Sequence, residues 1–448
     1  SDTTIAASSL NTLDGNTTGS VNAASITTLT GSLAEIIQAY NSGGISGLGN
    51  EAITLNDTTI AVATLNTLNG NTTGVINANT VTTLTGTAAE IISLFIGPGP
   101  GLQGITGLGD EDIALDGNTT VAQFNTIAAN TIGVVTATIS EGDMSSLNAI
   151  TETGNALTIT VTDASVDAAA LNTLDGKTTV AVTINSSTIR GTAGEMVTAF
   201  QAQGSTFSGL DDAEANINSG TATVAQVNMI AANTTGVVTA TISEGDMSSL
   251  NAITETGNAY TISVTDASVD AAALNTLDGK TTVAVTVNST TLTGTAADIN
   301  TAYNANAAGT ITNLGNEEVT ISDTTIDAAL LITLDDHTSG IIDASSILNL
   351  TGSDADKAIV RASSGITGLP DGRGGDYIVT DTTISAGELI SLDSQYETVN
   401  ASSVTTITGS AADINIVYTP GNAVTITGLG NEAITLNDTT LEVATLNT

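Results

Sequence analysis

The chain has 448 residues, of which 46 are acidic and six are basic, and its formal net charge is −40. Such a charge excludes nucleic acid and an anionic membrane surface as partners, because both repel an acidic protein. Cysteine is absent and aromatic residues make up 2 %, which excludes disulfides, thiol chemistry and a core built around large rings.

Nothing in the sequence predicts a membrane segment or a leader. No apolar run approaches the roughly 20 residues that a transmembrane helix needs. Ser1 opens in the middle of a repeating pattern, and the final "DTTLEVATLNT" stops where internal copies continue into "LDG". We therefore expect residues 1–448 to form one continuous array that is a segment of a longer repetitive protein.

Two kinds of segment alternate along the chain. The first is centred on "LNTLDG", which begins at Leu10, Leu65, Leu171 and Leu274. The second reads "ITTLTGSLAEIIQAY" from Ile26 and returns with small changes in every pair. A fixed alternation of this kind is typical of a stacked repeat architecture.

The second kind of segment contains a helix-start signal. A Ser or Thr is followed three residues later by Glu or Asp, which is the pattern of a capping box, and the Asp versions should reach back less well. In the copy at 81–95, a strand is expected before Gly86, which makes the corner, and a helix with Ile91 and Phe95 in the core is expected after it. The eight pairs are Ser32/Glu35, Thr87/Glu90, Ser140/Asp143, Thr192/Glu195, Ser243/Asp246, Thr295/Asp298, Ser353/Asp356 and Ser410/Asp413.

The first kind of segment predicts a strand and a helix as well. Residues 157–166, "LTITVTDASV", alternate like a single strand, and residues 167–174 read as a helix with Asp167 at its N-cap. Gly176 is expected to close this helix in the left-handed conformation. In one member of this class, Ser385 and Glu388 form a further capping box.

The predicted fold class is therefore a repeat solenoid. Each coil of about 27 residues has one short strand and one short helix, and two alternating coil types make a repeat of about 55 residues. About sixteen such coils would stack into a parallel β-solenoid with short helices, right-handed because β-α-β crossovers almost always are. The alternative divides each pair into three coils of about 18 residues, an all-β solenoid. Capping boxes favour the α/β version, since they have no role inside strands.

The sequence gives little support for an enzyme. His337 is the only histidine and lies in "LDDHTSG", which reads as a solvated turn, so that no nucleophile and base pair can be assembled around it. The Thr-rich strands raise the alternative of a flat ice-binding Thr array, but the coils vary in length and the Thr pattern drifts. We expect no catalytic residues and no required cofactor.

A metal site is the remaining candidate. A Gly-rich acidic turn recurs between the two coil types, as in "GLGNE" (47–51 and 428–432) and "GLGDED" (107–112). Carboxylate and amide oxygens at such a corner are ligands that calcium prefers. The alternative is a tight turn in which Gly or Asn supplies a positive φ and the acid is exposed. The calcium candidates are Glu51, Asp110, Asp112, Asp211, Glu317 and Glu432.

The combination of "ISGLGNEAITLNDTTIAVATLNTLNGNTTG" with "VTTLTGTAAEI" resembles the repeats of giant repetitive cell-surface proteins of marine cyanobacteria, of the large swimming-associated type. The resemblance covers essentially the whole chain and implies an extracellular, cell-surface role, structural or adhesive, without catalytic residues. The stretch "GLPDGRGGD" at 368–376 departs from the pattern and is a candidate for a specialised contact.

The sequence thus predicts a non-enzymatic structural protein that forms an elongated rod in an extracellular filament, surface layer or adhesin. Expected partners are copies of the chain itself, end to end or side by side, together with divalent cations or surface polysaccharide. Nucleic acid and membrane insertion are not expected. The alternative function is a calcium-dependent or carbohydrate-binding adhesin module.

Overall fold

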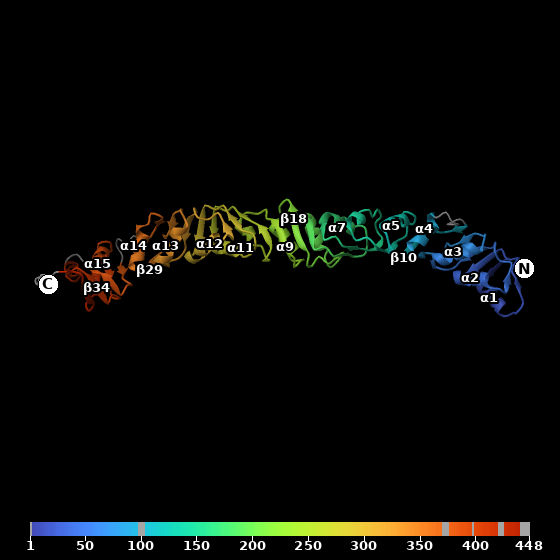
Figure 1. Cartoon of the computed structure of the whole chain (residues 1–448), viewed down its shortest axis with the longest axis horizontal. Helices are drawn as coiled ribbons and strands as arrows, with labels where there is room; N and C mark the ends of the chain where they lie inside the picture. The colour runs from blue at the N-terminus through green and yellow to red at the C-terminus, as the bar shows by residue number, and fades with distance from the viewer. Residues whose placement is uncertain (1, 97–103, 370–375, 397, 420–424, 440–448) are drawn as a thin grey trace. The chain divides into compact units, whose positions relative to one another are not determined.

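The computed structural model describes residues 2–96, 104–369, 376–396, 398–419 and 425–439. Short strands and short helices alternate along the whole of this part (Figure 1). The chain divides into two compact units, Ser1–Ala240 and Thr241–Thr448. Each unit is an α/β repeat structure with parallel strands, and the expectation of one continuous array stays a prediction.

The described part contains sixteen helices, which are between 4 residues (α6 and α10) and 13 residues (α12) long. Their first residues are between 23 residues apart (Val121 to Met144) and 33 residues apart (Ala88 to Val121), with a mean of about 27. The helices are α1 Ala7–Gly15, α2 Leu33–Asn41, α3 Val62–Asn71, α4 Ala88–Ile96, α5 Val121–Ala128, α6 Met144–Leu147, α7 Ala168–Asp175, α8 Ala193–Gln201, α9 Val224–Ala231, α10 Met247–Leu250, α11 Ala271–Asp278, α12 Ala296–Ala308, α13 Ala328–His337, α14 Asp354–Ala362, α15 Ala386–Asp393 and α16 Ala411–Tyr418.

The strands of the N-terminal unit are two to eight residues long. They are β1 Thr4–Ala6, β2 Val21–Asn22, β3 Thr28–Gly31, β4 Ile45–Ser46, β5 Ala52–Leu55, β6 Thr59–Ala61, β7 Ile76–Asn77, β8 Thr83–Gly86, β9 Ile105–Thr106, β10 Asp112–Thr119, β11 Val135–Ile139, β12 Ala156–Thr158, β13 Thr160–Val161, β14 Ser165–Asp167, β15 Val182–Ile184, β16 Thr188–Thr192, β17 Phe207–Ser208, β18 Glu214–Ser219 and β19 Val238–Thr241.

The strands of the C-terminal unit are equally short. They are β20 Ala259–Thr261, β21 Ser263–Val264, β22 Ser268–Asp270, β23 Val285–Val287, β24 Thr291–Gly294, β25 Ile311–Thr312, β26 Glu318–Ile321, β27 Thr325–Asp327, β28 Ile342–Asp343, β29 Asn349–Thr351, β30 Ile366–Thr367, β31 Asp376–Ile378, β32 Thr383–Ser385, β33 Thr398–Asn400, β34 Thr406–Gly409, β35 Ile426–Thr427 and β36 Ala433–Leu436.

Strands pair in parallel with the equivalent strand of the next repeat. In the first sheet, Ile5 of β1 lies opposite Leu29 of β3, and Leu29 lies opposite Ile53 of β5, at steps of 24 residues. The C-terminal unit repeats the pattern, with Val269 of β22 opposite Leu292 of β24. Apolar side chains are therefore stacked on apolar side chains from repeat to repeat, and the positions beside them in these strands carry Thr, Ser, Ala or Asp.

Four of the described strands, β5, β10, β18 and β26, each join two sheet positions. β5 pairs on one side with β3, which precedes a helix, and on the other side with β7, which follows a helix. β26 does the same between β24 and β28 in the C-terminal unit. We call strands of this kind joining strands. Each of them directly follows one of the Gly-rich acidic turns. These turns therefore lie where the sheet passes from strands that precede a helix to strands that follow a helix.

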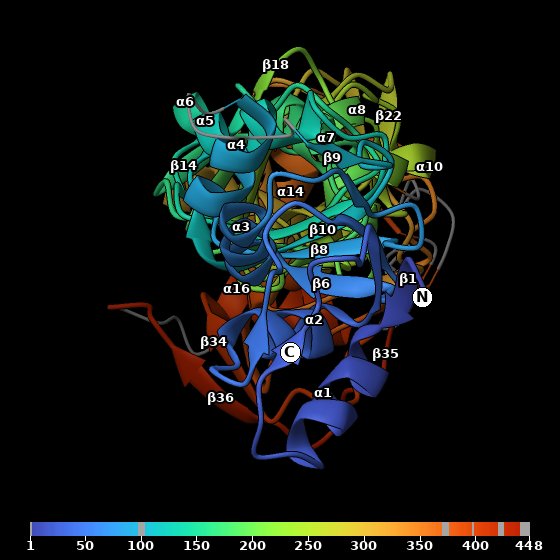
Figure 2. The same ribbon diagram turned by 90° about the vertical axis from the view of Figure 1, so that its right-hand side faces the viewer.

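Helices form a second layer against the strands, and most of them contact the helix of the next repeat, as α1 contacts α2 and α2 contacts α3 (Figures 1 and 2). Asn side chains of the "LNTL" motif connect these helices. Nδ2 of Asn11 donates to the carbonyl oxygen of Glu35 in the next helix at 2.9 Å, and Asn275 repeats this contact with Asp298 at 2.9 Å. Helices this short are marginal in isolation, so packing between repeats must stabilise them.

The helix caps confirm most of the predicted boxes. Ser32, Thr87, Thr192, Thr295, Ser353 and Ser410 accept from the backbone N–H three residues later, as does Ser385. Glu35, Glu90 and Glu195 also accept from the N-cap backbone N–H. The Asp residues accept from the cap hydroxyl instead, because the shorter side chain does not reach the backbone.

Three local predictions were wrong. Ser140 and Ser243 are not caps, because α6 and α10 begin after Asp143 and Asp246, whose own carboxylates accept from the N–H groups of Ser146 and Ser249. Gly176 is right-handed, with φ −67°, so α7 ends without a left-handed glycine. Residues 157–166 contribute to three short strands, β12, β13 and β14, since the chain changes sheet twice within them.

Candidate functional site: the acidic corners

The acidic turns place a glutamate inside the protein rather than on its surface. Glu51 is 0 % exposed and Glu317 is 2 % exposed, and Glu111, which the sequence analysis did not single out, is 1 % exposed. Buried carboxylates are costly unless they are hydrogen-bonded. These three side chains therefore need donors from the corner itself.

The donors are a glycine N–H and a tyrosine hydroxyl. Oε2 of Glu51 accepts from the N–H of Gly49 and from the hydroxyl of Tyr40 in the preceding helix, both at 2.8 Å. Glu317 accepts in the same way from Gly315 at 2.9 Å and from Tyr303 at 3.3 Å. Burial, with the neighbouring carboxylates as a further cause, raises the pKa of both tyrosines, so the hydroxyls stay protonated as donors.

The same corner also receives bonds from the following repeat. The hydroxyl of Thr72 donates to the carbonyl oxygen of Glu51 at 3.0 Å, and Thr338 donates to that of Glu317 at 2.9 Å. Gly74, two residues after Thr72, approaches the corner so closely that a Cβ there would lie 2.0 Å from the oxygen of Glu51. The buried glutamate therefore holds three consecutive segments of chain together.

Tyrosine and glutamate vary together among the repeats. Tyr418 stands with Glu432, and its hydroxyl donates to Oε2 of that glutamate, whose other bonds come from Gly430. The repeat with Phe200 in place of tyrosine has Ala213 in place of glutamate. The exception is Glu111, whose repeat has Phe95 and whose Oε2 accepts from Gly109 at 2.7 Å. Oε1 of Glu111 is buried without a partner, and so is Oε1 of Glu51, whose tyrosine donates to Oε2.

The exposed calcium candidates lie apart from this network. Asp110, Asp112 and Asp211 are exposed, and they are not brought together. Oδ1 of Asp112 accepts from the N–H of Val134 at 2.7 Å, and Oδ1 of Asp211 accepts from the side chain of Gln203 at 3.3 Å. Within the described ranges, no three His, Asp or Glu side chains gather in a way that could hold a metal ion.

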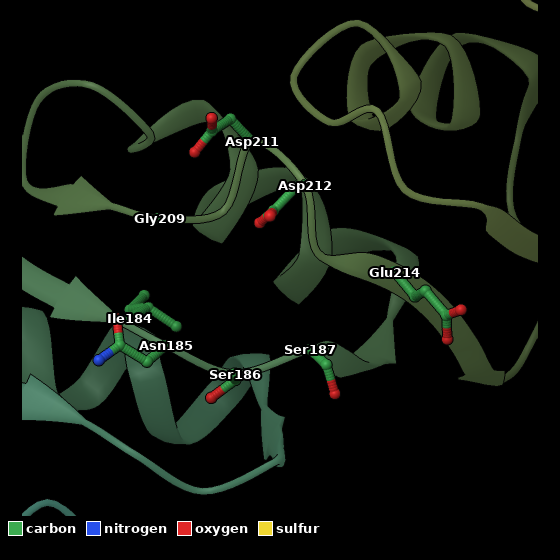
Figure 3. Close-up of a pocket in the computed structure, with 8 residues that line it drawn as sticks. All are labelled: Ile184, Asn185, Ser186, Ser187, Gly209, Asp211, Asp212 and Glu214. Atoms are coloured by element: carbon green, nitrogen blue, oxygen red, sulfur yellow. The ribbon is translucent and has the colours of Figure 1, made fainter.

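An open cavity of about 670 Å³ adjoins the corner that lacks the Tyr/Glu pair (Figure 3). It lies between residues 184–187 of one repeat and residues 209–214 of the next. Figure 3 shows the carboxylates of Asp211, Asp212 and Glu214 pointing in different directions. The cavity is polar and acidic, but its carboxylates do not converge on a point.

Acidic residues of the next repeat cap the helices, and the sequence analysis missed this role. Oδ2 of Asp57 accepts from the N–H of Leu33, the first residue of α2, at 2.6 Å. This contact satisfies an unpaired helix N–H and places a negative charge at the positive end of the helix. The recurrent "DTT" and "TDAS" stretches were the available signal. The other bonds of this kind are Glu141 to Val121, Asp163 to Met144, Asp266 to Met247, Asp323 to Ala296, Asp381 to Asp354 and Asp438 to Ala411.

A second set of acids connects repeats at the other end of the helix. Asp14, in "LDG", accepts from the hydroxyl of Ser42 in the following repeat at 2.6 Å. Asp278 accepts from Thr310 at 2.9 Å, and Asp335 accepts from Ser363 at 2.7 Å. Many carboxylates are thus partnered by backbone N–H groups and hydroxyls, which explains how a chain with six bases can hold 46 acids.

The repeat that departs from the pattern has a polar core. Lys357 is 1 % exposed at the position where the other segments of the second kind have Ile or Met, and its Nζ lies 3.3 Å from Oδ1 of Asp354, the one salt bridge among the described residues. The hydroxyl of Tyr377 donates to the same oxygen, and Arg361 stacks over Tyr377 and Tyr396. Of the stretch "GLPDGRGGD" at 368–376, residues 370–375 lie outside the described residues, so its contact role stays a prediction.

His337 is not in a turn. It is the last residue of α13 and half-buried, and its ring is stacked on that of Tyr303 with centroids 5.5 Å apart. Tyr303 is the donor to buried Glu317, so this histidine packs beside one of the acidic corners.

In the part of the chain described, no helix is both apolar and long enough to cross a membrane. In comparisons with known proteins, the chain matches no family model, no curated protein and no solved structure.

Proposed function

We propose that this chain is a non-enzymatic structural element of a cell surface, in which the repeats wind into a right-handed α/β solenoid and form a rod. The observation that carries the proposal is the use of the acidic side chains. They cap helices, fill corners and accept hydroxyls of neighbouring repeats, as Asp57, Glu51 and Asp14 do. These hydrogen bonds of the acidic side chains recur along the array and connect one repeat to the next. Side chains used in this way support a scaffold role.

Stacked repeats of this kind suit a mechanical role. Each repeat contacts its neighbours through parallel strands, helix packing and side-chain bonds, so stability is shared along the array. The net charge of −40 keeps neighbouring rods apart at low salt and lets counterions screen the repulsion at higher salt. An extracellular filament, surface layer or adhesin is the setting that we infer for such a rod.

Imaging and localisation test this proposal. Negative-stain electron microscopy of the purified chain should show rods of uniform width, and immunogold labelling of intact source cells should place the protein outside the cell envelope. Compact particles, or label confined to the cell interior, would contradict it.

A calcium-dependent or carbohydrate-binding adhesin module is the second candidate. The acidic cavity beside Asp211, Asp212 and Glu214 is the observation that favours it. If calcium binds there, millimolar calcium should raise the melting temperature well above the effect of equal magnesium, and D211N/D212N should abolish the difference. Equal effects of the two cations would indicate charge screening alone.

A further inference from the structure

Two tyrosine rings are in contact in the repeat that contains α15 (Figure 1). Tyr377 lies in β31, before this helix, and Tyr396 follows the helix. Their ring centroids are 4.5 Å apart and their planes are inclined by 46°. This separation is at the close end of the range of about 4.5–7 Å that aromatic pairs adopt. The chain has six tyrosines, and among the described residues no other two of them form a ring contact.

Positive charge holds this pair of rings in place. The guanidinium carbon of Arg361 lies 5.3 Å from the ring centroid of Tyr377 and 5.1 Å from that of Tyr396. Nζ of Lys357 lies 5.1 Å from the centroid of Tyr377. A cation over a ring face is attracted by the electrons of the ring. The same cations oppose a positive charge on either ring, so a ring that loses an electron must lose a proton with it.

A proton acceptor is already bonded to one of the two phenols. The hydroxyl of Tyr377 donates to Oδ1 of Asp354, a carboxylate that is 4 % exposed. Oδ2 of Asp354 is buried and has no hydrogen-bond partner in the described part of the chain. A carboxylate in this position accepts the phenol proton as the electron leaves, and a neutral tyrosyl radical remains.

The second ring is closer to the surface. Tyr396 is half-buried, whereas Tyr377 is 4 % exposed. The hydroxyl of Tyr396 has no hydrogen-bond partner among the residues that the structure describes. An oxidant therefore reaches the pair through Tyr396, and removal of its hydroxyl breaks no hydrogen bond of the fold.

We propose that Tyr377 and Tyr396 are the site of an oxidative cross-link, a carbon–carbon bond between the two rings, formed by a peroxidase and hydrogen peroxide. Each phenol gives up one electron and one proton, and the two radicals couple at ring carbons next to their hydroxyls. The hydrogens on those two carbons then move to the phenol oxygens, which restores both hydroxyls. The two electrons and two protons that were released reduce one hydrogen peroxide to two water molecules.

The cross-link closes one repeat covalently. Tyr377 and Tyr396 enclose α15, and β31 pairs directly with β33, which follows Tyr396. A bond between the two ends of this segment limits its opening, as a disulfide does in other proteins. The chain has no cysteine and cannot form disulfides. The inference rests on the proposed function for its setting, because the outside of a cell is oxidising.

Mass spectrometry tests the cross-link directly. The purified chain, at a concentration where it is monomeric, is treated with a haem peroxidase and hydrogen peroxide. The wild-type chain should lose the mass of two hydrogen atoms and develop the blue fluorescence of dityrosine. After proteolysis, the peptide that contains Tyr377 should be joined to the peptide that contains Tyr396. Oxidation without this joined peptide would overturn the proposal.

Two single variants test the choice of tyrosines. Y396F removes a hydroxyl that has no partner, so it should fold normally and lose at least tenfold in intramolecular cross-link. The matched control is Y418F, because Tyr418 is 37 % exposed and is more accessible to an oxidant. Y418F should keep the wild-type yield, and melting curves check the fold of both variants. Equal yields from Y396F and the wild-type chain would contradict the proposal.

A further pair of variants tests the proton acceptor. K357M introduces the residue that Met196 supplies at the equivalent position, and it retains the carboxylate of Asp354. D354N/K357M replaces this carboxylate with an amide, which still accepts from the hydroxyl of Tyr377 but is a far weaker base. Cross-linking should be at least fivefold slower in D354N/K357M than in K357M. Equal rates in two folded variants would refute the assigned path of the proton.

The two proposals fail separately. A chain that gives no bond between Tyr377 and Tyr396 but is found outside the cell envelope keeps the proposed function and loses the cross-link. A chain that cross-links as expected but is found inside the cell keeps the cross-link chemistry and loses the function.

Discussion

Replacing Phe95 with tyrosine should stabilise the corner that contains Glu111. In the repeats with a tyrosine at the equivalent position, its hydroxyl reaches the buried glutamate, as Tyr40 reaches Glu51 at 2.8 Å. The repeat with Phe95 lacks this donor, and Oε2 of the buried Glu111 accepts from the N–H of Gly109 at 2.7 Å without a tyrosine hydroxyl beside it. F95Y supplies the missing hydroxyl from an already half-buried ring.

The magnitude follows from the strength of one added hydrogen bond to a buried carboxylate. A hydrogen bond to a charged group contributes about 1.5–3 kcal/mol. In the chain itself, Phe200 is the matched control, because Ala213 stands where its glutamate would be. F200Y places a hydroxyl in a buried site without that acceptor, which should cost about 1–3 kcal/mol.

Hydrogen exchange is the appropriate assay, because an array of this length opens locally and one global free energy of unfolding is poorly defined. The reporter for F95Y is the N–H of Gly109, which donates to Glu111 at 2.7 Å. Under conditions where exchange reports the opening equilibrium, F95Y should slow it by roughly ten- to hundredfold, since about 1.4 kcal/mol corresponds to a factor of ten. Faster exchange is expected around residue 210 in F200Y.

Two results would refute this reasoning. If Gly109 exchanged at the wild-type rate in F95Y, a tyrosine hydroxyl would not stabilise the corner that contains Glu111. If F200Y were stabilised as much as F95Y, the pairing of tyrosine with glutamate would have no energetic basis.

Three further outcomes are expected. D57A should destabilise α2 by about 0.5–2 kcal/mol, because the N–H of Leu33 loses its cap. Segment-resolved hydrogen exchange should show faster opening of α2. Unchanged exchange would argue against caps supplied by the next repeat. G74A should disrupt the corner at Glu51, since the new Cβ would lie 2.0 Å from the carbonyl oxygen of Glu51. In G70A the new Cβ has open space within α3, so this control should be neutral or stabilising by up to about 1 kcal/mol. Melting curves compare the two variants. Acid should lower the melting temperature. Hydrogen bonds in the helix caps hold the folded-state pKa of Glu90, Asp143, Glu195 and Asp246 below the unfolded values of 4.5 (Glu) and 3.8 (Asp), so their contribution to stability is present above those values and is lost as the pH falls through the folded-state pKa. A melting temperature that rose between pH 5 and pH 3 would contradict this.

Local signals in the sequence predicted the helices well and the strands less well. A hydroxyl three residues before an acid marked helix starts such as Thr87 and Thr192, because a capping box is formed within one turn of chain. The strands are only two to eight residues long, so their ends depend on which neighbour is available for pairing. Residues 157–166 alternate like one strand, but partners in three different sheets divide them.

The acidic corners show the same limit for the candidate site. The turn geometry was predictable, because Gly47 and Asn313 adopt a positive φ, which glycine and asparagine tolerate best. The direction in which the acid points was not predictable. Glu51 turns inward because Tyr40, Gly49 and Thr72 from three segments of chain meet around it, and Asp110 stays outside.

The sequence by itself determined the repeat, its length, the alternation of strand and helix and the absence of cysteine chemistry, because each of these is written in residue order or composition. The tertiary structure decided what the acids do. Asp57 caps Leu33 across 24 residues, and Tyr418 meets Glu432 across 14. Such contacts depend on how one repeat is placed against the next, and the physical reason is that a carboxylate binds whichever N–H or hydroxyl the stacking brings within reach.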